Sequence, residues 1–285
     1  MPVKFSLTIT PPQGALKAEL ERLLVAARHP AGDFDGLAAM MESNFKVAAL
    51  QWGGCFNSDA RIDAEIDFKQ AENDDEGAGT GSKGFVNLPR APARYPGMHL
   101  IMDGAAAQIA GAGNPNIPGI SITLAVSKYL TQQVWFDPDP VGRSQPVPAG
   151  LVDGVTLFLH EMGHGLGFNG RLVQASDVPI AKWGKPQDDV VSTFDDQVEF
   201  DGANFFFHGP SAMAVNDGQP VPLSDLQGDD VRGRNNNYCH VGNDAGTCMW
   251  CRCDLMTGYP WEVGRRYGIS RLDLAMLKDV GLPVV

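Results

Sequence analysis

The sequence predicts an α+β protein, and three observations support this fold class. Apolar residues alternate with polar ones in three short stretches, which predicts strands at 5–9, 62–68 and 120–126. Other stretches have apolar residues at helical spacing, which predicts helices at 13–28, 34–50, 97–110, 153–167 and 270–278. Beyond Gly170, glycine, aspartate, asparagine and proline become frequent, so we expect an irregular, loop-rich C-terminal part with short strands near 198–207.

The segments around these elements carry signals of their own. Residues 72–84 are polar and rich in glycine, so we expect a loop whose acidic start is either plainly solvated or holds Ca²⁺. A proline-rich loop over 137–148 leads into the helix at 153–167. Ser270 and Asp273 have the spacing of a capping box, and Gly281 is placed to cap the end of the last helix.

Composition limits the classes of function. The chain has 285 residues, which fits one large domain or two subdomains that share a cleft. Its net charge is −12, from 22 basic and 34 acidic residues, and it has no basic run, so nucleic acid and anionic membrane surfaces are poor partners. No apolar stretch is long enough to predict a membrane span, and Met1–Thr10 does not have the pattern of a signal peptide.

The segment His160–Gly167 carries the most information about function. It reads H-E-x-x-H-x-x-G, in which His160 and His164 lie on one face of a helix and can hold one Zn²⁺. Glu161 lies at the edge of that face, where it can take a proton from a zinc-bound water. Asp153 is the expected N-cap. The same helix has a predicted buried face formed by Val155, Leu159, Met162 and Leu166.

A catalytic zinc needs a third protein ligand and one open position. The chain has six histidines, which makes the search for that ligand short. We favour His240, because the cysteines beside it can hold its loop rigid. The alternatives are His208, which lies in an apolar run where a packed histidine is more natural, and the carboxylate of Glu199.

A family resemblance follows from a second segment, Asp254-Leu255-Met256-Thr257-Gly258, which precedes the last helix. Together with H-E-x-x-H-x-x-G, it makes the chain resemble a metzincin metallopeptidase, in which a methionine in a tight turn lies beneath the zinc histidines. The usual third histidine of that clan would fall at Gly170, which cannot ligate a metal. The long gap before His240 is similar instead to leishmanolysin-type enzymes and related bacterial metallopeptidases. The strong resemblance covers residues 120–285, and the cysteine cluster after His240 lengthens one gap relative to that group.

The resemblance implies a fold and an activity. The expected fold is a metzincin-like catalytic domain with a twisted mixed sheet and helices. An N-terminal catalytic subdomain would span 1–167, and a C-terminal subdomain with the distal ligand, the Met-turn and the final helix would span 168–285. The expected activity is zinc-dependent endopeptidase hydrolysis of peptide bonds, with Glu161 as the general base. The expected zinc ligands are His160, His164 and His240.

The resemblance also implies a protein or peptide substrate, a monomer, and a secreted or extracellular location. The strand at 120–126 would form the upper edge of the cleft, where an extended peptide could pair with it, unless it is an ordinary interior strand. Tyr259 either donates to the reaction's oxyanion or faces outward from the turn. Two other functions stay open: a catalytically inactive zinc-binding protein, and a gluzincin-like peptidase with Glu199 as the third ligand.

The cysteines are unevenly placed. Four of them crowd into a short C-terminal segment, at Cys239, Cys248, Cys251 and Cys253, whereas Cys55 stands alone. We favour disulfides within this cluster over a second zinc site, because a closed zinc site normally uses two well-separated pairs of ligands. Disulfides would imply an oxidising compartment.

Overall fold

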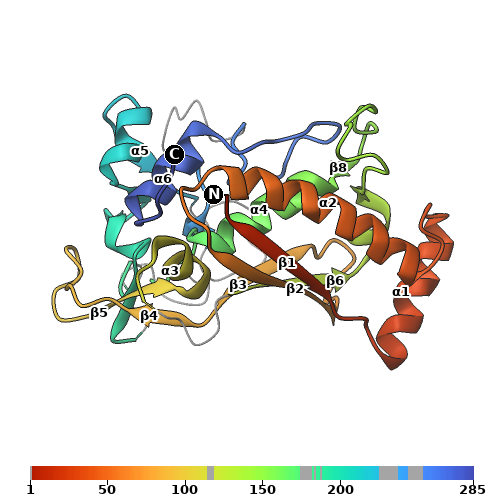
Figure 1. Ribbon diagram of the computed structural model, residues 1–285, viewed down its shortest axis with the longest axis horizontal. Helices are drawn as coiled ribbons and strands as arrows, with labels where there is room; N and C mark the ends of the chain where they lie inside the picture. Colours follow the sequence, from red (N-terminus) through yellow and green to blue (C-terminus); the bar gives the residue numbers. More distant parts are fainter. Residues whose placement is uncertain are drawn as a thin grey trace.

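The computed structural model describes residues 2–113, 119–173, 182, 184–186, 188–224, 237–242 and 253–285. Figure 1 shows a central sheet crossed by long helices, with α5 and α6 at the opposite end of the molecule from α1. The chain is therefore a mixed α and β protein, and the predicted α+β class is confirmed at that level. None of the described helices is long and apolar enough to cross a membrane.

The central sheet has four strands in the order β1-β2-β6-β3. Three are parallel: β1 (Lys4–Ile9), β2 (Arg61–Gln70) and β6 (Gly119–Val126). Alternate residues of β2 are buried from Ile62 to Ile66, as their spacing predicts, so the three predicted strands are confirmed. However, β6 lies inside the sheet, and the expectation that it forms the edge of the cleft is wrong.

The edge is formed by β3 (Ala78–Lys83), which pairs antiparallel with β6. This strand lies in the segment 72–84, where we expected a loop, and the expectation is wrong for its second half. The sequence AGTGSK has neither apolar alternation nor β-branched residues beyond one threonine, so local propensity does not indicate a strand. Backbone hydrogen bonds to β6 hold it in place, and an edge strand needs no buried side chains to form them.

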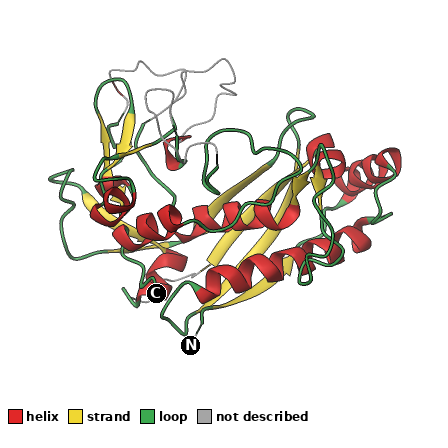
Figure 2. Ribbon diagram, turned by 90° about the horizontal axis from the view of Figure 1, so that it is seen from above, coloured by secondary structure: helices red, strands yellow, loops and turns green. Residues whose placement is uncertain are grey.

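Two helices in the first third of the chain have the positions that the sequence predicts. They are α1 (Gly14–Ala27) and α2 (Phe34–Gly54), and α2 begins where Asp33 accepts a hydrogen bond from the Gly36 N–H at 2.9 Å. Figure 2 shows long helices lying across the strands of the sheet, and α2 packs beside α4 (Gly154–Leu166). The indole of Trp52 donates to the carbonyl of Leu159 at 2.9 Å, which ties the two helices together.

The predicted helix at 97–110 is wrong in its first half. A strand, β5 (His99–Asp103), comes first, and α3 (Gly104–Ala110) follows it. Residues 100–102 (LIM) are apolar, which suits a buried strand as well as a buried helix. So short a run does not distinguish the two. What decides is pairing: β5 lies between β4 (Phe85–Asn87) and β9 (Val190–Ser192), and the latter is far away in sequence.

The C-terminal part has short elements joined by long connections, as composition predicts. A three-stranded sheet contains β10, β11 and β12, which confirms the strands expected near 198–207. Ser270 and Asp273 form the predicted capping box at the start of α6. The bounds are β7 (Val134–Trp135), β8 (Val152–Asp153), β10 (Val198–Phe200), β11 (Phe205–Phe207), β12 (Val221–Pro222), α5 (Pro210–Val215) and α6 (Arg271–Asp279).

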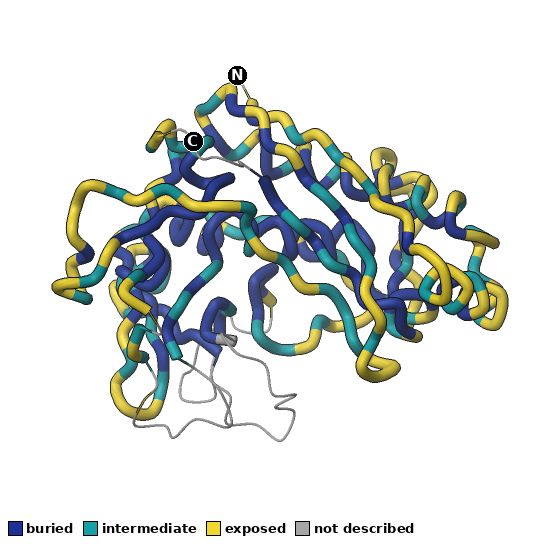
Figure 3. Tube along the Cα trace, turned by 90° about the horizontal axis from the view of Figure 1, so that it is seen from below, coloured by how far each residue is buried: buried dark blue, intermediate teal, exposed yellow. Residues whose placement is uncertain are grey.

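The hydrophobic core is one contiguous cluster that draws residues from both parts of the chain. It includes Trp52 from α2, Phe158 from α4 and Met276 from α6. Figure 3 shows the buried trace running through the middle of the molecule, with the exposed trace on its outer loops. The helix α4 lies in this core, so polar residues on it must face a partner or a cavity. The division into an N-terminal subdomain (1–167) and a C-terminal subdomain (168–285) stays a prediction.

Candidate metal centre

The helix α4 carries the first two candidate ligands, and local chemistry sets its ends. Asp153 is the N-cap, because its Oδ2 accepts hydrogen bonds from the backbone N–H and the hydroxyl of Thr156, both at 2.9 Å. Gly167 follows the last turn with φ 145°, a backbone conformation that favours glycine. The four predicted apolar positions are all buried, so the predicted helix and its cap are confirmed.

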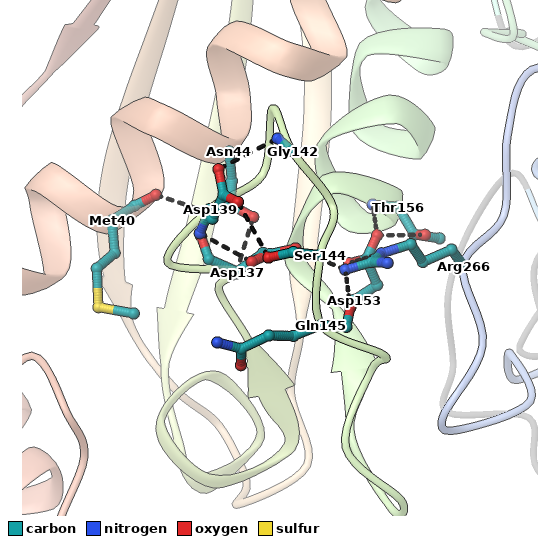
Figure 4. Close-up of polar contacts among 10 residues, drawn as sticks. All are labelled: Met40, Asn44, Asp137, Asp139, Gly142, Ser144, Gln145, Asp153, Thr156 and Arg266. Carbon is teal, nitrogen blue, oxygen red and sulfur yellow. Dashed lines mark hydrogen bonds and ion pairs between the residues drawn. The ribbon is translucent and has the colours of Figure 1, made fainter.

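A buried ion-pair cluster holds the start of α4 (Figure 4). Arg266 lies between two carboxylates, with Nη2 at 2.5 Å from Oδ2 of Asp137 and Nε at 3.4 Å from Oδ1 of Asp153. Asn44 of α2 joins the cluster, since its amide donates to the Asp137 carbonyl at 2.9 Å and accepts from the Asp137 N–H at 3.1 Å. The cap of α4 is thereby tied to α2 and to the segment that precedes α6.

Three histidines meet beside α4. The Nε2 atoms of His160 and His164 are 3.1 Å apart, and those of His164 and His240 are also 3.1 Å apart. The third side of the triangle, between His240 and His160, measures 3.2 Å. These three side chains lie close enough to bind one metal ion, and they are the one such group found among the described residues. We call them the His triad.

The hydrogen bonds of the triad fix the state of two imidazoles. Nδ1 of His160 lies 2.9 Å from the carbonyl of Leu255, and Nδ1 of His164 lies 2.7 Å from the carbonyl of Phe168. A carbonyl only accepts, so each Nδ1 donates, and in a neutral ring Nε2 then carries a lone pair. Burial, followed by the charges of the other two histidines, holds the pKa of His160 well below its usual value. Burial also lowers the pKa of His164.

The donor set fits a divalent metal of the zinc type. Neutral imidazole nitrogens are common zinc ligands, and ligands about 2.0–2.1 Å from a tetrahedral ion lie about 3.3 Å from one another. The observed separations of 3.1 Å and 3.2 Å are close to that value. The lone pairs on Nε2 of His160 and His164 face the same point, where a cation could accept both.

The segment that carries His240 is held from both sides. On one side, the N–H of Ser224 donates to the carbonyl of His240 at 2.8 Å. On the other, Val241 donates to the carbonyl of Met256 at 2.7 Å and accepts from the N–H of Gly258 at 2.9 Å. The turn that contains Met256 therefore lies against the third ligand, in the order expected from the sequence.

Met256 packs beneath the triad against the helix. Its side chain is fully buried, and a Cβ atom placed on Gly163 would lie only 2.6 Å from its Sδ. Glycine at 163 thus allows the Met256 side chain to approach α4 closely. Trp261 covers the other side of His160, with the two ring centroids 4.9 Å apart and the rings perpendicular.

A cavity of about 450 Å³ opens onto the triad. Its walls include Ala78 and Thr80 of the edge strand β3, Glu161 of α4, and the aromatic rings of Tyr129 and Trp261. The Thr80 hydroxyl donates to Oε2 of Glu161 at 2.5 Å, so the edge strand positions that carboxylate. Sequence reasoning missed Thr80, Tyr129 and Trp261, because nothing in their local sequence indicates that they face the cavity.

The other candidates lie elsewhere. His208 and Glu199, the alternative third ligands, face each other at 3.5 Å in the β10–β11 region, and Glu199 also pairs with Arg94. Neither belongs to the triad. Tyr259 is not among the residues that line the cavity, which agrees with an outward-facing turn residue. His29 accepts a hydrogen bond from the N–H of Ala31 within its own turn.

The disulfides and the calcium site considered from the sequence both stay predictions. Cys55, Cys239 and Cys253 are free thiols, whereas Cys248 and Cys251 lie outside the described residues. Disulfides in the cluster therefore stay a prediction. In the acidic segment that is either plainly solvated or holds Ca²⁺, Glu76 pairs with Lys69, and Asp74 pairs with Lys128. Calcium binding there likewise stays a prediction.

Comparison with known proteins adds no relative. No protein-family profile matches the sequence, and no curated protein or solved structure is significantly similar to it.

Proposed function

We propose that this chain is a zinc-dependent endopeptidase of the metzincin type, with a leishmanolysin-like distal third ligand. The observation that carries the proposal is the His triad with Glu161 beside it in one cavity. The triad supplies three imidazole nitrogen ligands and leaves room for a fourth, which is the donor count of a catalytic rather than a structural zinc site. The buried Met256 beneath the triad supports the choice of clan.

The chemistry divides between the metal and the chain. When bound, zinc supplies Lewis-acid activation of water and of a carbonyl oxygen. Glu161 holds the proton that water must lose and returns it to the nitrogen of the leaving amine. Thr80 fixes the orientation of the Glu161 carboxylate by donating a hydrogen bond to its Oε2. The Nδ1 bonds of His160 and His164 keep both rings oriented while this happens.

The edge strand supports an extended peptide as the substrate. The N–H of Ala125 donates to the carbonyl of Gly77 at 3.0 Å, and in an antiparallel ladder bonded pairs alternate with unbonded ones. Ala78, Thr80 and Ser82 therefore direct their backbone N–H and C=O groups away from β6. No described strand pairs with that side of β3. An added peptide strand would find these groups beside Glu161 and the triad, which suits cleavage within a chain.

The test is substitution of the proposed base. Glu161→Gln removes the proton acceptor but keeps the shape of the side chain, so we expect bound zinc to stay at one ion per chain. Peptide cleavage should fall by roughly 10²–10⁴-fold, the usual size of general acid–base catalysis. Zinc content is measured by atomic absorption, and cleavage is measured on a mixture of peptides read by mass spectrometry.

Two outcomes would contradict the proposal. One is turnover by Glu161→Gln at the wild-type rate. The other is a zinc-loaded wild-type chain that cleaves no internal peptide bond in the mixture, which would favour a zinc-binding protein without catalysis.

A further inference from the structure

Gly170 has a structural reason to be glycine. It stands where the usual metzincin pattern has its third histidine, and the structure leaves no room there for any side chain. A Cβ atom placed on Gly170 would overlap the hydroxyl of Tyr238 and lie 2.5 Å from Oδ1 of Asp195. The residue that fills this space, Tyr238, belongs to the same short segment as the replacement ligand His240.

The Tyr238 hydroxyl is fixed by two hydrogen bonds. It donates to Oδ1 of Asp195 at 2.7 Å and accepts from the N–H of Leu172 at 2.7 Å. The ring is fully buried and stacks on Phe205, with centroids 4.9 Å apart. The ring thus packs on β11, while the hydroxyl is hydrogen-bonded to the segment that follows α4.

Asp195 joins this hydroxyl to two other segments. Its Oδ2 accepts from the N–H of Arg171 at 2.9 Å and from the N–H of Ser192 at 2.8 Å. Its own N–H donates to the Ser192 hydroxyl at 3.0 Å. Because Asp195 is fully buried and bonded to the segment directly after α4, it provides a rigid reference point for anything attached to it.

We propose that Tyr238 is the positioning residue of the third metal ligand, acting through its hydrogen bonds to Asp195 and Leu172. The bonds set how deeply the 238–242 segment lies against the end of α4, and therefore where the imidazole of His240 stands relative to His164. Metal affinity is sensitive to such a displacement, because a ligand out of place by a fraction of an ångström loses its bond. The inference rests on metal binding by the triad, which is part of the proposed function, but not on catalysis.

The experiment compares two tyrosines that each lose one hydrogen-bonded hydroxyl, the buried Tyr238 and the partly buried Tyr95. Tyr238→Phe keeps the stacked ring and removes the anchor. Tyr95→Phe is the matched control, since the Tyr95 hydroxyl donates to the carbonyl of Val198 at 3.1 Å and does not contact the triad. Zn²⁺ and Co²⁺ affinities are measured by competition with a chelator, and the visible spectrum of bound Co²⁺ reports ligand geometry.

We expect Tyr238→Phe to weaken metal binding by roughly 10- to 100-fold and to change the Co²⁺ spectrum. Tyr95→Phe should leave both unchanged, even if both variants lower the melting temperature of the metal-free chain alike. At saturating zinc, any peptidase activity of Tyr238→Phe should recover most of its wild-type kcat, which a catalytic role would not allow. Affinity within twofold of the wild type, with an unchanged spectrum, would overturn the inference.

A second variant covers the case in which Tyr238→Phe does not fold. Asp195→Asn keeps an oxygen that can accept but removes the charge that strengthens the bond to Tyr238. It should also weaken metal binding by several-fold, and wild-type affinity in this variant would reject the anchor. If the wild-type chain itself binds neither Zn²⁺ nor Co²⁺, the proposed metal site and this inference are both overturned, whereas a metal-binding chain without peptidase activity would overturn only the proposed catalysis.

Discussion

Removal of the Arg266 guanidinium is the sharpest test of how α4 is held in place. This side chain is 20% exposed, whereas the carboxylates of Asp137 and Asp153 that it contacts are at most 1% exposed. Its Nη2 also donates to the carbonyl of Gln145 at 2.8 Å, and its guanidinium lies 5.5 Å from the centroid of the Trp135 ring. Arg266→Met keeps most of the aliphatic stem and leaves two buried carboxylates without their cation (Figure 4).

The expected loss can be worked from these contacts. Breaking a buried ion pair by removing one partner costs about 3–5 kcal/mol. The partial exposure of Arg266 reduces this figure, and so do donors that remain: Asp153 keeps its bonds from Thr156, and Asp137 keeps one from the N–H of Asp139 at 2.9 Å. We therefore expect Arg266→Met to lower the free energy of unfolding by about 2–4 kcal/mol. That is a large share of the total stability of a domain.

The assay is urea unfolding of the metal-free chain, with chelator present so that bound metal does not add to stability. Arg265→Met is the matched control, because Arg265 pairs with Glu262, whose side chain is 71% exposed, and such a pair contributes at most about 1 kcal/mol. Combining Arg266→Met with Asp137→Asn should recover part of the loss, since one unpaired charge is then gone. A loss below about 1 kcal/mol, or one equal to that of Arg265→Met, would refute the reasoning.

Three further outcomes are expected. Thr80→Val should lower kcat for peptide cleavage roughly 10-fold or more, because Glu161 loses a charged hydrogen bond, while Thr80→Ser should retain activity in steady-state kinetics; equal kcat in both would contradict this. Gly163→Ala should lower the free energy of unfolding, measured in urea, by about 1 kcal/mol or more. Alanine stabilises a helix by roughly 1 kcal/mol relative to glycine, but the added Cβ would crowd Met256, and we expect the cost of that crowding to exceed the gain. A higher free energy of unfolding would show that the turn can move. Burial raises the pKa of Asp103 to about 7, so the folded state holds this proton more tightly, and stability from this group is full below about pH 4 and falls as pH rises to about 7. Asp103→Asn should remove that fall, by at most about 4 kcal/mol, in urea unfolding from pH 4 to 8; identical pH profiles would contradict it.

Sequence reasoning succeeded where a pattern is local. The buried stripe of α4 with its Asp153 cap, and the capping box of Ser270 and Asp273, are each written within a dozen residues. The strand β2 shows the same: its alternation from Ile62 to Ile66 predicts which face is buried. In these places, side-chain period and backbone capping are enough to specify the structure.

It failed where the decisive partner is distant. The glycine-rich β3 is a strand only because β6 offers it a ladder of hydrogen bonds, and β5 is a strand because β9 pairs with it. The site shows the same division. The small number of histidines made His240 a candidate that the structure brings beside His160 and His164, but the Tyr238–Asp195 bond and the Thr80 contact to Glu161 depend on pairs of residues that no local pattern connects.

Two ligands of the triad are one helical turn apart, while the third is 76 residues beyond His164. A nascent chain that has made α4 therefore offers only two imidazoles of the triad, and two hold a metal far more weakly than three. Under the proposed function, full affinity would arise only when the last third of the chain has docked, so metal capture would report the completion of folding. In the proposed peptidase, this order would protect the chain from cleaving itself. Peptidase activity would appear only after the chain's own cleavable segments have folded.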